Sequence, residues 1–157
     1  LDRPRHADII AELRGLGCGI HLIPDGDVAG VIAVTNEDTG IDLYMGTGGA
    51  PEGVLAAAAL RCVGGQMQGR LILDTEAKRE RAFRMGVTDP ARKYRMEELA
   101  SGDVIVAATG VTDGALLQGV KFRGSVITTE TVIYRSLNGT VRRIHGEHRQ
   151  MSKFNLD

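Results

Sequence analysis

A glycine-rich stretch followed by proline and glutamate is the part of the sequence whose residue types and spacing most favour chemistry. Residues 46–52 read GTGGAPE, which predicts a loop that enters a helix at Pro51, because proline is well tolerated in the first helical turn. The free N–H groups at such a helix start favour a bound phosphate. Glu52 would lie in the first turn, where the helix dipole favours an ionised carboxylate that can bind a hard metal ion. A tight turn with an acidic helix start is the alternative.

The same glycines do not form a nucleotide-binding fingerprint. The dinucleotide pattern G-x-G-x-x-G begins at Gly46, but Pro51 occupies the position of its third glycine. No Gly-Lys-Ser/Thr follows the loop, so the P-loop pattern is missing as well. The loop therefore favours neither a nicotinamide or flavin site nor a P-loop.

Two carboxylates flank a glycine in Asp25-Gly26-Asp27, a turn by its composition. Gly26 permits the turn, and the side chains of Asp25 and Asp27 are suited to binding a metal ion or to accepting hydrogen bonds from sugar hydroxyls. Asp27 is equally suited to capping a helix over 28–34, with Asp25 left in solvent. The residues alone leave these interpretations open.

A rigid basic pair lies near the start of the sequence in Arg3-Pro4-Arg5. Proline restricts the backbone between the two arginines, and two guanidinium groups can grip a phosphate through paired hydrogen bonds. A solvated surface pair is the alternative that such a short motif favours when it is taken alone.

Two further polar segments carry weaker signals. Residues 109–114, TGVTDG, offer hydroxyl groups and the carboxylate of Asp113 after an expected strand, and they either bind substrate or only close a turn. His145-Gly146-Glu147-His148 has two histidines three positions apart. That spacing suits a metal ion when both lie on one helical face, but the stretch follows a strand and contains glycine, so a surface position is expected.

Helical and strand patterns alternate along the chain and predict an α/β fold that ends in an antiparallel hairpin. The hairpin is indicated by Asn138-Gly139, a strong turn signal between two β-rich runs. In an open α/β sheet, ligands gather at the carboxyl ends of strands, and we expect each of the three polar loops to follow a strand. The predicted helices are 6–16, 28–34, 51–63, 75–85 and 96–100, and the predicted strands are 20–23, 41–45, 70–73, 104–108, 125–136 and 140–144.

Bulk composition is that of a single globular domain. The 157 residues are 43% hydrophobic and carry a net charge of −1, so neither a nucleic-acid surface nor an anionic membrane surface is expected. No run approaches the ~20 apolar residues of a membrane span. Cys18 and Cys62 lie far apart without a C-x-x-C pattern, which favours two reduced, buried thiols in a cytosolic protein.

Several of these segments together resemble the class II (GlpX-type) fructose-1,6-bisphosphatases. The most specific match is the long glycine-to-alanine segment that contains Glu52, and the order and spacing of the shorter matches agree with it. The resemblance covers nearly the whole chain, with Arg3 at a position where many relatives have lysine. The matching segments are 3–6, 23–29, 46–60, 65–71, 108–114 and 128–131.

The resemblance implies a layered α/β sandwich of the lithium-sensitive sugar phosphatase type. It implies hydrolysis of the 1-phosphate of fructose 1,6-bisphosphate to give fructose 6-phosphate and phosphate, a step of gluconeogenesis. It also implies Mn2+ or Mg2+ as cofactor, a cytoplasmic location and a homodimer or homotetramer. The substrate-binding positions that it carries over are Arg3, Pro4, Arg5, Asp25, Gly26, Asp27 and Gly49, Glu52 is the metal ligand, and no catalytic residue is carried over.

By the same resemblance, we expect residues 1–157 to be the carboxy-terminal domain of such a phosphatase. The family's other metal-binding carboxylates lie in an amino-terminal part that this sequence does not contain, so we expect the chain to need that portion as a partner and to be inactive alone. Two alternatives stay open. One is a bifunctional fructose-1,6-/sedoheptulose-1,7-bisphosphatase, and the other is a non-catalytic module that binds a phosphosugar or a nucleotide.

Overall fold

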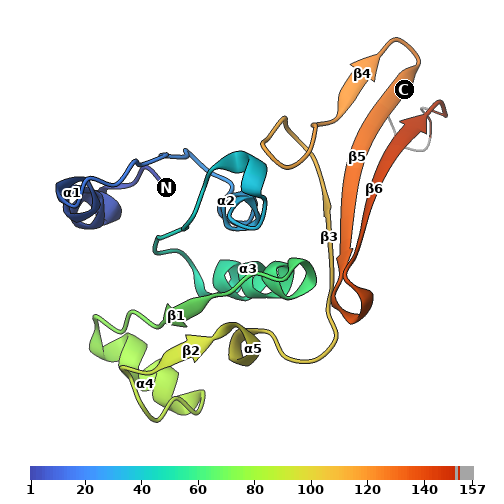
Figure 1. Cartoon of the computed structure of the whole chain (residues 1–157). Coiled ribbons are helices and arrows are strands. Elements are labelled where there is room, and N and C mark those ends of the chain that lie inside the picture. Colours follow the sequence, from blue (N-terminus) through green and yellow to red (C-terminus); the bar gives the residue numbers. More distant parts are fainter. Residues whose placement is uncertain (151, 153–157) are drawn as a thin grey trace.

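The computed structural model describes residues 1–150 and residue 152 as a mixed α/β protein with two antiparallel sheets (Figure 1). Its elements are η1 (Pro4–His6), α1 (Ala7–Gly15), α2 (Asp27–Ala33), η2 (Glu37–Thr39), α3 (Ala50–Val63), β1 (Gln68–Arg70), α4 (Glu76–Arg84), β2 (Lys93–Arg95), α5 (Met96–Leu99), β3 (Ile105–Thr109), β4 (Lys121–Arg123), β5 (Val126–Arg135), η3 (Ser136–Asn138) and β6 (Thr140–His148). Helix α3 lies between α2 and α5, and the larger sheet stands at one side of it.

Helix α3 is the element around which the core is built. It begins with Pro51 in its first turn and ends at Gly64, whose φ of 89° is left-handed and whose N–H donates to the Leu60 carbonyl at 2.8 Å. Its residues 56–60 and Cys62 are buried, and each cluster of buried apolar side chains in the described part of the chain contains a residue of this helix. A helix that is apolar on most sides is buried by its neighbours, and its small alanines let those neighbours approach closely.

The larger sheet is organised around the long strand β5. Strand β6 pairs with it from Arg135 opposite Thr140 to Ile127 opposite His148, while β3 and β4 pair with its two ends on the other side. Val132 of β5 is fully buried and belongs to the same apolar cluster as Cys62 of α3. The sheet thereby closes one side of the core, and the predicted terminal hairpin is confirmed.

Two predicted strands, 20–23 and 41–45, are wrong. Within the described residues, neither segment has a paired strand beside it, and a strand is stable only when its backbone groups are bonded to a neighbour. The segments instead lie along helix α2: a Cβ atom at Gly30 would be 2.9 Å from Ile23 Cδ1 and 2.8 Å from Tyr44 Cε2. The polar loops after these segments therefore do not follow strands, and the expected gathering at a sheet edge is wrong for them.

Smaller departures concern the ends of elements. The strand expected at 70–73 is β1, which lies two to three residues earlier and pairs with β2. Asp27 is the first residue of α2 rather than its N-cap. The N-cap position is taken by Gly26, which has a φ of 80° and no side chain with which to cap the helix. The predicted helices over 6–16, 51–63, 75–85 and 96–100 are confirmed to within a few residues.

None of the helices in the described residues combines the length and the apolar character that a membrane crossing requires.

The two cysteines differ in environment. Cys62 is buried as expected, and burial raises the pKa of its thiol. Cys18 is exposed, which contradicts the expectation of two buried thiols. The reason is that Cys18 follows α1, a helix with no buried residue of its own, so the chain after it stays at the surface.

Truncating the central helix should be costly. Leu60 is 1% exposed and packs with Val31 and Ala56, so Leu60→Ala is expected to lower the free energy of unfolding of the intact protein by about 2–5 kcal/mol. Urea unfolding followed by circular dichroism measures this. Val111→Ala is the control, since Val111 is 77% exposed and surface changes usually stay within about 0.5 kcal/mol. Equal losses in both variants would contradict the central position of α3.

Candidate functional site

Residues 3–5, the arginine segment, are hydrogen-bonded to backbone carbonyls at or before residues 25–27, the aspartate turn. The guanidinium of Arg3 donates to the Pro24 carbonyl at 2.7 Å from Nη2 and to the Asp2 carbonyl at 2.9 Å from Nη1. The Asp2 N–H donates to the Ile23 carbonyl at 2.9 Å. Pro4 opens η1 directly after Arg3. Arg3 therefore holds the segment against the turn that carries Asp25 and Asp27.

Arg5 and His6 connect the same segment to the glycine loop through hydrogen bonds. Arg5 Nε donates to the Thr47 carbonyl at 2.7 Å. His6 Nε2 accepts a hydrogen bond from the Thr47 N–H at 2.8 Å, and His6 Nδ1 lies 2.7 Å from the Leu1 carbonyl. Both backbone polar groups of Thr47, its N–H and its carbonyl, are thus bound by consecutive side chains of η1.

The aspartate turn and the glycine loop also lie against each other. A Cβ atom at Gly48 would be 3.2 Å from Asp27 Oδ2, so the absence of a side chain there lets the carboxylate approach the loop. Gly26 supplies the left-handed conformation that the turn needs, and Asp25 beside it is exposed. The structure brings the aspartates to the glycine loop without any shared strand edge.

Glu52 lies in the first turn of α3, as the sequence predicts. Its carboxylate folds back over Gly49, because a Cβ atom at Gly49 would come within 2.2 Å of Glu52 Oε2. The carboxylate therefore lies beside the start of α3. Gly49 is needed at this position if Glu52 is to keep this orientation.

Sequence reasoning missed two side chains that support the site. Burial, followed by the negative charge of Asp27, raises the pKa of the Tyr44 hydroxyl, while Arg5 lowers it in part. Tyr44 therefore lies within electrostatic reach of both charged residues. His6 is the other; the sequence places it at the start of the helix predicted over 6–16 and in the matching segment 3–6. No local pattern indicates the supporting role of either residue, because their partners are distant in sequence.

The similarity to known proteins covers this whole region. A family profile described as "Bacterial fructose-1,6-bisphosphatase, glpX-encoded" matches residues 1–148. The chain belongs to this family. Two similar proteins are each named D-fructose 1,6-bisphosphatase class 2/sedoheptulose 1,7-bisphosphatase. The one from Synechococcus sp. (strain JA-3-3Ab) is 43% identical over 94% of this chain and 46% of its own length. The one from Synechocystis sp. (strain ATCC 27184 / PCC 6803 / Kazusa) is 40% identical over 97% and 48%.

The chain spans about half the length of the curated relatives it matches. All residues that the GlpX-type resemblance carries over lie inside the matched range, and the structure brings their three segments together in one place. The recognition made from sequence motifs is confirmed.

The metal-ligand set within the described residues is incomplete. Glu52 offers one carboxylate of the kind that hard cations prefer, but no group of three or more His, Cys, Asp or Glu side chains in residues 1–150 and 152 is placed to hold a metal ion. Such ions take several oxygen ligands. The part of the chain described here thus fits one ligand of a cation and not a whole site.

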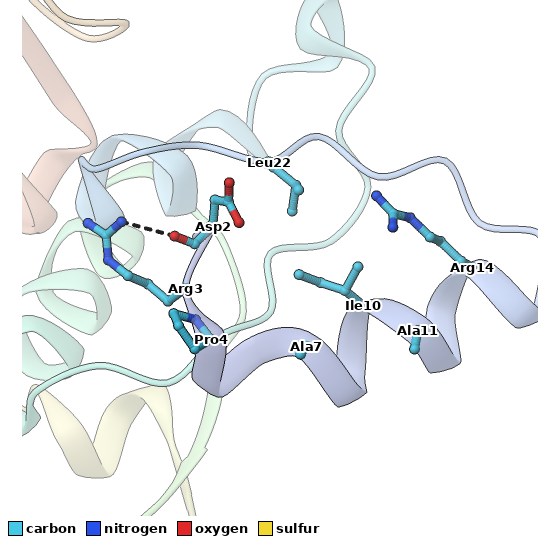
Figure 2. A pocket seen from close by; sticks show the side chains of 8 residues that line it. All are labelled: Asp2, Arg3, Pro4, Ala7, Ile10, Ala11, Arg14 and Leu22. Carbon is cyan, nitrogen blue, oxygen red and sulfur yellow. Dashed lines mark hydrogen bonds between the residues drawn. The ribbon is translucent and has the colours of Figure 1, made fainter.

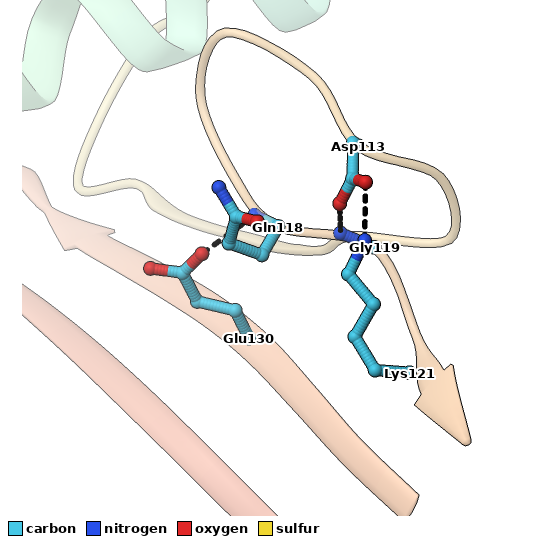
Figure 3. Close-up of polar contacts among 5 residues, drawn as sticks. All are labelled: Asp113, Gln118, Gly119, Lys121 and Glu130. Atoms are coloured by element: carbon cyan, nitrogen blue, oxygen red, sulfur yellow. Dashed lines mark hydrogen bonds and ion pairs between the residues drawn. The ribbon is translucent and has the colours of Figure 1, made fainter. Parts of the chain in front are cut away.

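The polar loop after β3 is held by side-chain hydrogen bonds within the loop and to strands β4 and β5 (Figure 3). Asp113 accepts hydrogen bonds from the Lys121 ammonium and, at 2.9 Å, from the Gly119 N–H. The Lys121 and Gly119 bonds lower the pKa of the Asp113 carboxyl. Glu130 accepts a hydrogen bond from the Gln118 N–H at 2.6 Å. Of the two interpretations left open for this loop, the contacts favour closing the turn.

The two tail histidines lie on β6, where they extend the predicted strand. Three positions apart on a strand, His145 and His148 point to opposite faces of the sheet. His145 is paired with Glu130 in the register, and His148 Nε2 lies 3.1 Å from Thr129 Oγ1. A metal ion shared by both side chains does not fit this arrangement. The expected surface position holds for His145, which is exposed, while His148 is half-buried.

A surface hollow of about 400 Å3 lies beside the arginine segment (Figure 2). It is formed between α1 and the extended chain before the aspartate turn, with Arg3 and Arg14 toward its two ends. Its lining residues are Asp2, Arg3, Pro4, Ala7, Ile10, Ala11, Arg14 and Leu22. Arg5, Asp25, Asp27, Gly49 and Glu52 are not among them. Arg5, Asp25, Gly49 and Glu52 are themselves exposed, so the candidate site is an open surface.

Adding a methyl group at Gly49 should displace the Glu52 carboxylate. In the intact protein that contains this chain, we expect Gly49→Ala to weaken Mn2+ binding by about tenfold or more, the range seen when a ligand loses its orientation. Isothermal titration calorimetry measures the affinity. Gly53→Ala is the matched control, because a Cβ atom there meets nothing within 4 Å and the residue lies inside α3. Unchanged Mn2+ affinity in Gly49→Ala would contradict a role for the observed Glu52 orientation.

Proposed function

We propose that this chain forms the substrate-holding part of a metal-dependent sugar-bisphosphate phosphatase. The reaction is hydrolysis of the 1-phosphate of fructose 1,6-bisphosphate to fructose 6-phosphate and phosphate. The observation that carries the proposal is the joining of the Arg3–Arg5 segment, the aspartate turn and the glycine loop with Glu52 into one site. Family membership and the printed names of the relatives support it.

The arginines would bind the remote 6-phosphate. Arg5 uses Nε to hold Thr47, and its two terminal nitrogens have no hydrogen-bond partner within the described residues. Neither Arg3 nor Arg5 forms an ion pair in that part of the chain, because their partners are neutral carbonyls. Their positive charge is therefore not neutralised and favours an anionic substrate. Holding the remote phosphate orients the reacting end of the sugar.

The aspartates and the glycine loop would hold the rest of the substrate. Asp25 and Asp27 accept hydrogen bonds from sugar hydroxyls, and the amides around Gly48 and Gly49 seat the 1-phosphate at the start of α3. Asp25 is exposed and Asp27 is half-buried, so Asp25 can reach a ligand in solvent while Asp27 also borders the loop.

The cofactor would be Mn2+ or Mg2+. When bound, such an ion polarises phosphoryl oxygens and helps to form the attacking nucleophile from water. Glu52 would supply one oxygen ligand, and the other carboxylates would come from an amino-terminal portion of the same protein. The incomplete ligand set and the coverage of about half of each relative support this arrangement. Residues 1–157 are on this proposal a carboxy-terminal domain with the layered sandwich fold of the lithium-sensitive phosphatases.

A bifunctional enzyme is the second candidate, because the printed names of the relatives include sedoheptulose 1,7-bisphosphatase. The two bisphosphates carry the same chemistry at their ends, and the open surface of the site sets no limit on sugar length. A non-catalytic phosphosugar-binding module is the remaining alternative. The proposal further includes a cytoplasmic homodimer or homotetramer.

Phosphate release from fructose 1,6-bisphosphate tests the function directly. The intact protein with Mn2+ or Mg2+ is expected to release phosphate and to stop when the metal is chelated, while this chain alone is expected to be inactive because it holds one metal ligand. The same assay with sedoheptulose 1,7-bisphosphate decides between one substrate and two. Binding of the sugar bisphosphate without phosphate release by the intact protein would favour the binding module.

Removing the Glu52 carboxylate should slow catalysis severely. In the intact protein, Glu52→Ala is expected to lower kcat by about 10²- to 10³-fold, the range for losing one stabilising group of the transition state. Glu97→Ala is the control, since Glu97 is also an exposed glutamate in the first turn of a helix. Normal activity of Glu52→Ala would rule out Glu52 as a ligand of the catalytic metal ion.

Removing the Arg5 side chain should act mainly on substrate binding. Arg5→Ala is expected to raise KM by about tenfold to 100-fold in the intact protein, because a charged hydrogen bond contributes about 1.5–3 kcal/mol. Steady-state phosphate release gives KM and kcat separately. Arg14→Ala, which changes an arginine of α1 that lines the neighbouring hollow, should leave both near the wild-type values. A change in kcat alone would contradict 6-phosphate binding by Arg5.

A further inference from the structure

His6 is the one polar or charged residue that is buried in the described part of the chain, with 3% of its surface exposed. The proposed function gives it no role. It lies at the end of η1, directly after the arginine pair, and its ring contacts the loop that leads to Gly49 and Glu52. A buried imidazole with defined partners on both nitrogens is held in one orientation.

The partners of the ring determine where its proton lies. The Thr47 N–H can only donate, so His6 Nε2, 2.8 Å away, must be the unprotonated nitrogen. The Leu1 carbonyl can only accept, so Nδ1, 2.7 Å away, must carry the proton. The Thr47 carbonyl, 3.2 Å from Nε2, is bound instead by Arg5. A neutral imidazole protonated on Nδ1 is the form that satisfies these contacts.

The consequence is a pair of hydrogen bonds, here called the Thr47 lock, that bind both backbone polar groups of one residue. His6 binds the N–H of Thr47 and Arg5 binds its carbonyl, so the loop is held in register with η1. Thr47 directly precedes Gly48 and Gly49, which border Asp27 and Glu52. The position of Glu52 relative to the Arg5 guanidinium therefore depends on this lock.

We propose that His6 is a positioning residue that sets the spacing between the two phosphate-binding ends of the site. It acts as a neutral, Nδ1-protonated imidazole that anchors Thr47 and does not touch the substrate. This inference deepens the proposed phosphatase function and rests on it. A misplacement of about 1 Å in such a site can cost about 10²-fold in rate.

Two conservative variants separate anchoring from packing in the intact protein. The amide oxygen of His6→Gln reaches the place of Nε2 and can still accept from Thr47, whereas the shorter His6→Asn reaches only the place of Nδ1. We expect His6→Asn to lower kcat/KM for fructose 1,6-bisphosphate by about tenfold to 100-fold and His6→Gln to restore most of it. His21→Gln is the control, because His21 is exposed. Equal activity of the Gln and Asn variants at equal thermal stability would overturn the proposal.

A second measurement needs neither activity nor a variant. Nitrogen-15 NMR of the imidazole in the intact wild-type protein is expected to show a protonated Nδ1 and an unprotonated Nε2 for His6. A ring protonated on Nε2 could not accept from Thr47 and would overturn the lock, even if the variants fail to fold. If the intact protein releases no phosphate, the phosphatase proposal fails separately from the role of His6. The NMR spectrum, together with calorimetric binding of fructose 1,6-bisphosphate to the His6→Gln and His6→Asn variants, then decides the role of His6.

Discussion

The close packing of helix α3 on nearly all sides is the constraint on which the rest of the structure depends. Its alanines leave room for α2 and α5 and for the larger sheet, so these elements share one core through it. The same helix begins at the glycine loop and carries Glu52 in its first turn. The site therefore lies at the end of the most buried element, and α2, which carries Asp27, packs against it. Rigid elements of this kind hold functional groups more accurately than free loops do.

The arginine segment is joined to this framework in a way that preserves its charge. Arg3 and Arg5 donate to neutral backbone carbonyls rather than to carboxylates. An ion pair would have neutralised the guanidinium groups, whereas a carbonyl fixes their direction and leaves the positive charge for a ligand. Asp113 shows the opposite case, since its bond to Lys121 neutralises the carboxylate and commits it to holding a loop. The chain thus separates charges that support the fold from charges that remain available.

The candidate site is open, and this agrees with the extent of the chain relative to its family. It gathers the arginine segment, the aspartate turn and Glu52 around the glycine loop, and no group of three or more metal-ligating side chains occurs in the described residues. The relatives that it matches are about twice as long. The proposed division, in which this chain holds the substrate and an amino-terminal portion completes the metal site, accounts for both observations.

The sequence by itself determined the helices, the terminal hairpin and the kinds of residue in the site. Those features depend on local signals: Pro51 and Gly64 at the ends of α3, the Asn138-Gly139 turn, and the side-chain chemistry of the arginine, aspartate and glycine motifs. Only the tertiary structure decided that residues 20–23 and 41–45 pack along α2 instead of forming strands, because a strand exists only where another segment pairs with it. Only the tertiary structure placed His6 and Arg5 on Thr47, since these hydrogen bonds join residues 41 and 42 positions apart. Contacts over such distances are set by the packing of whole elements, which no local pattern encodes.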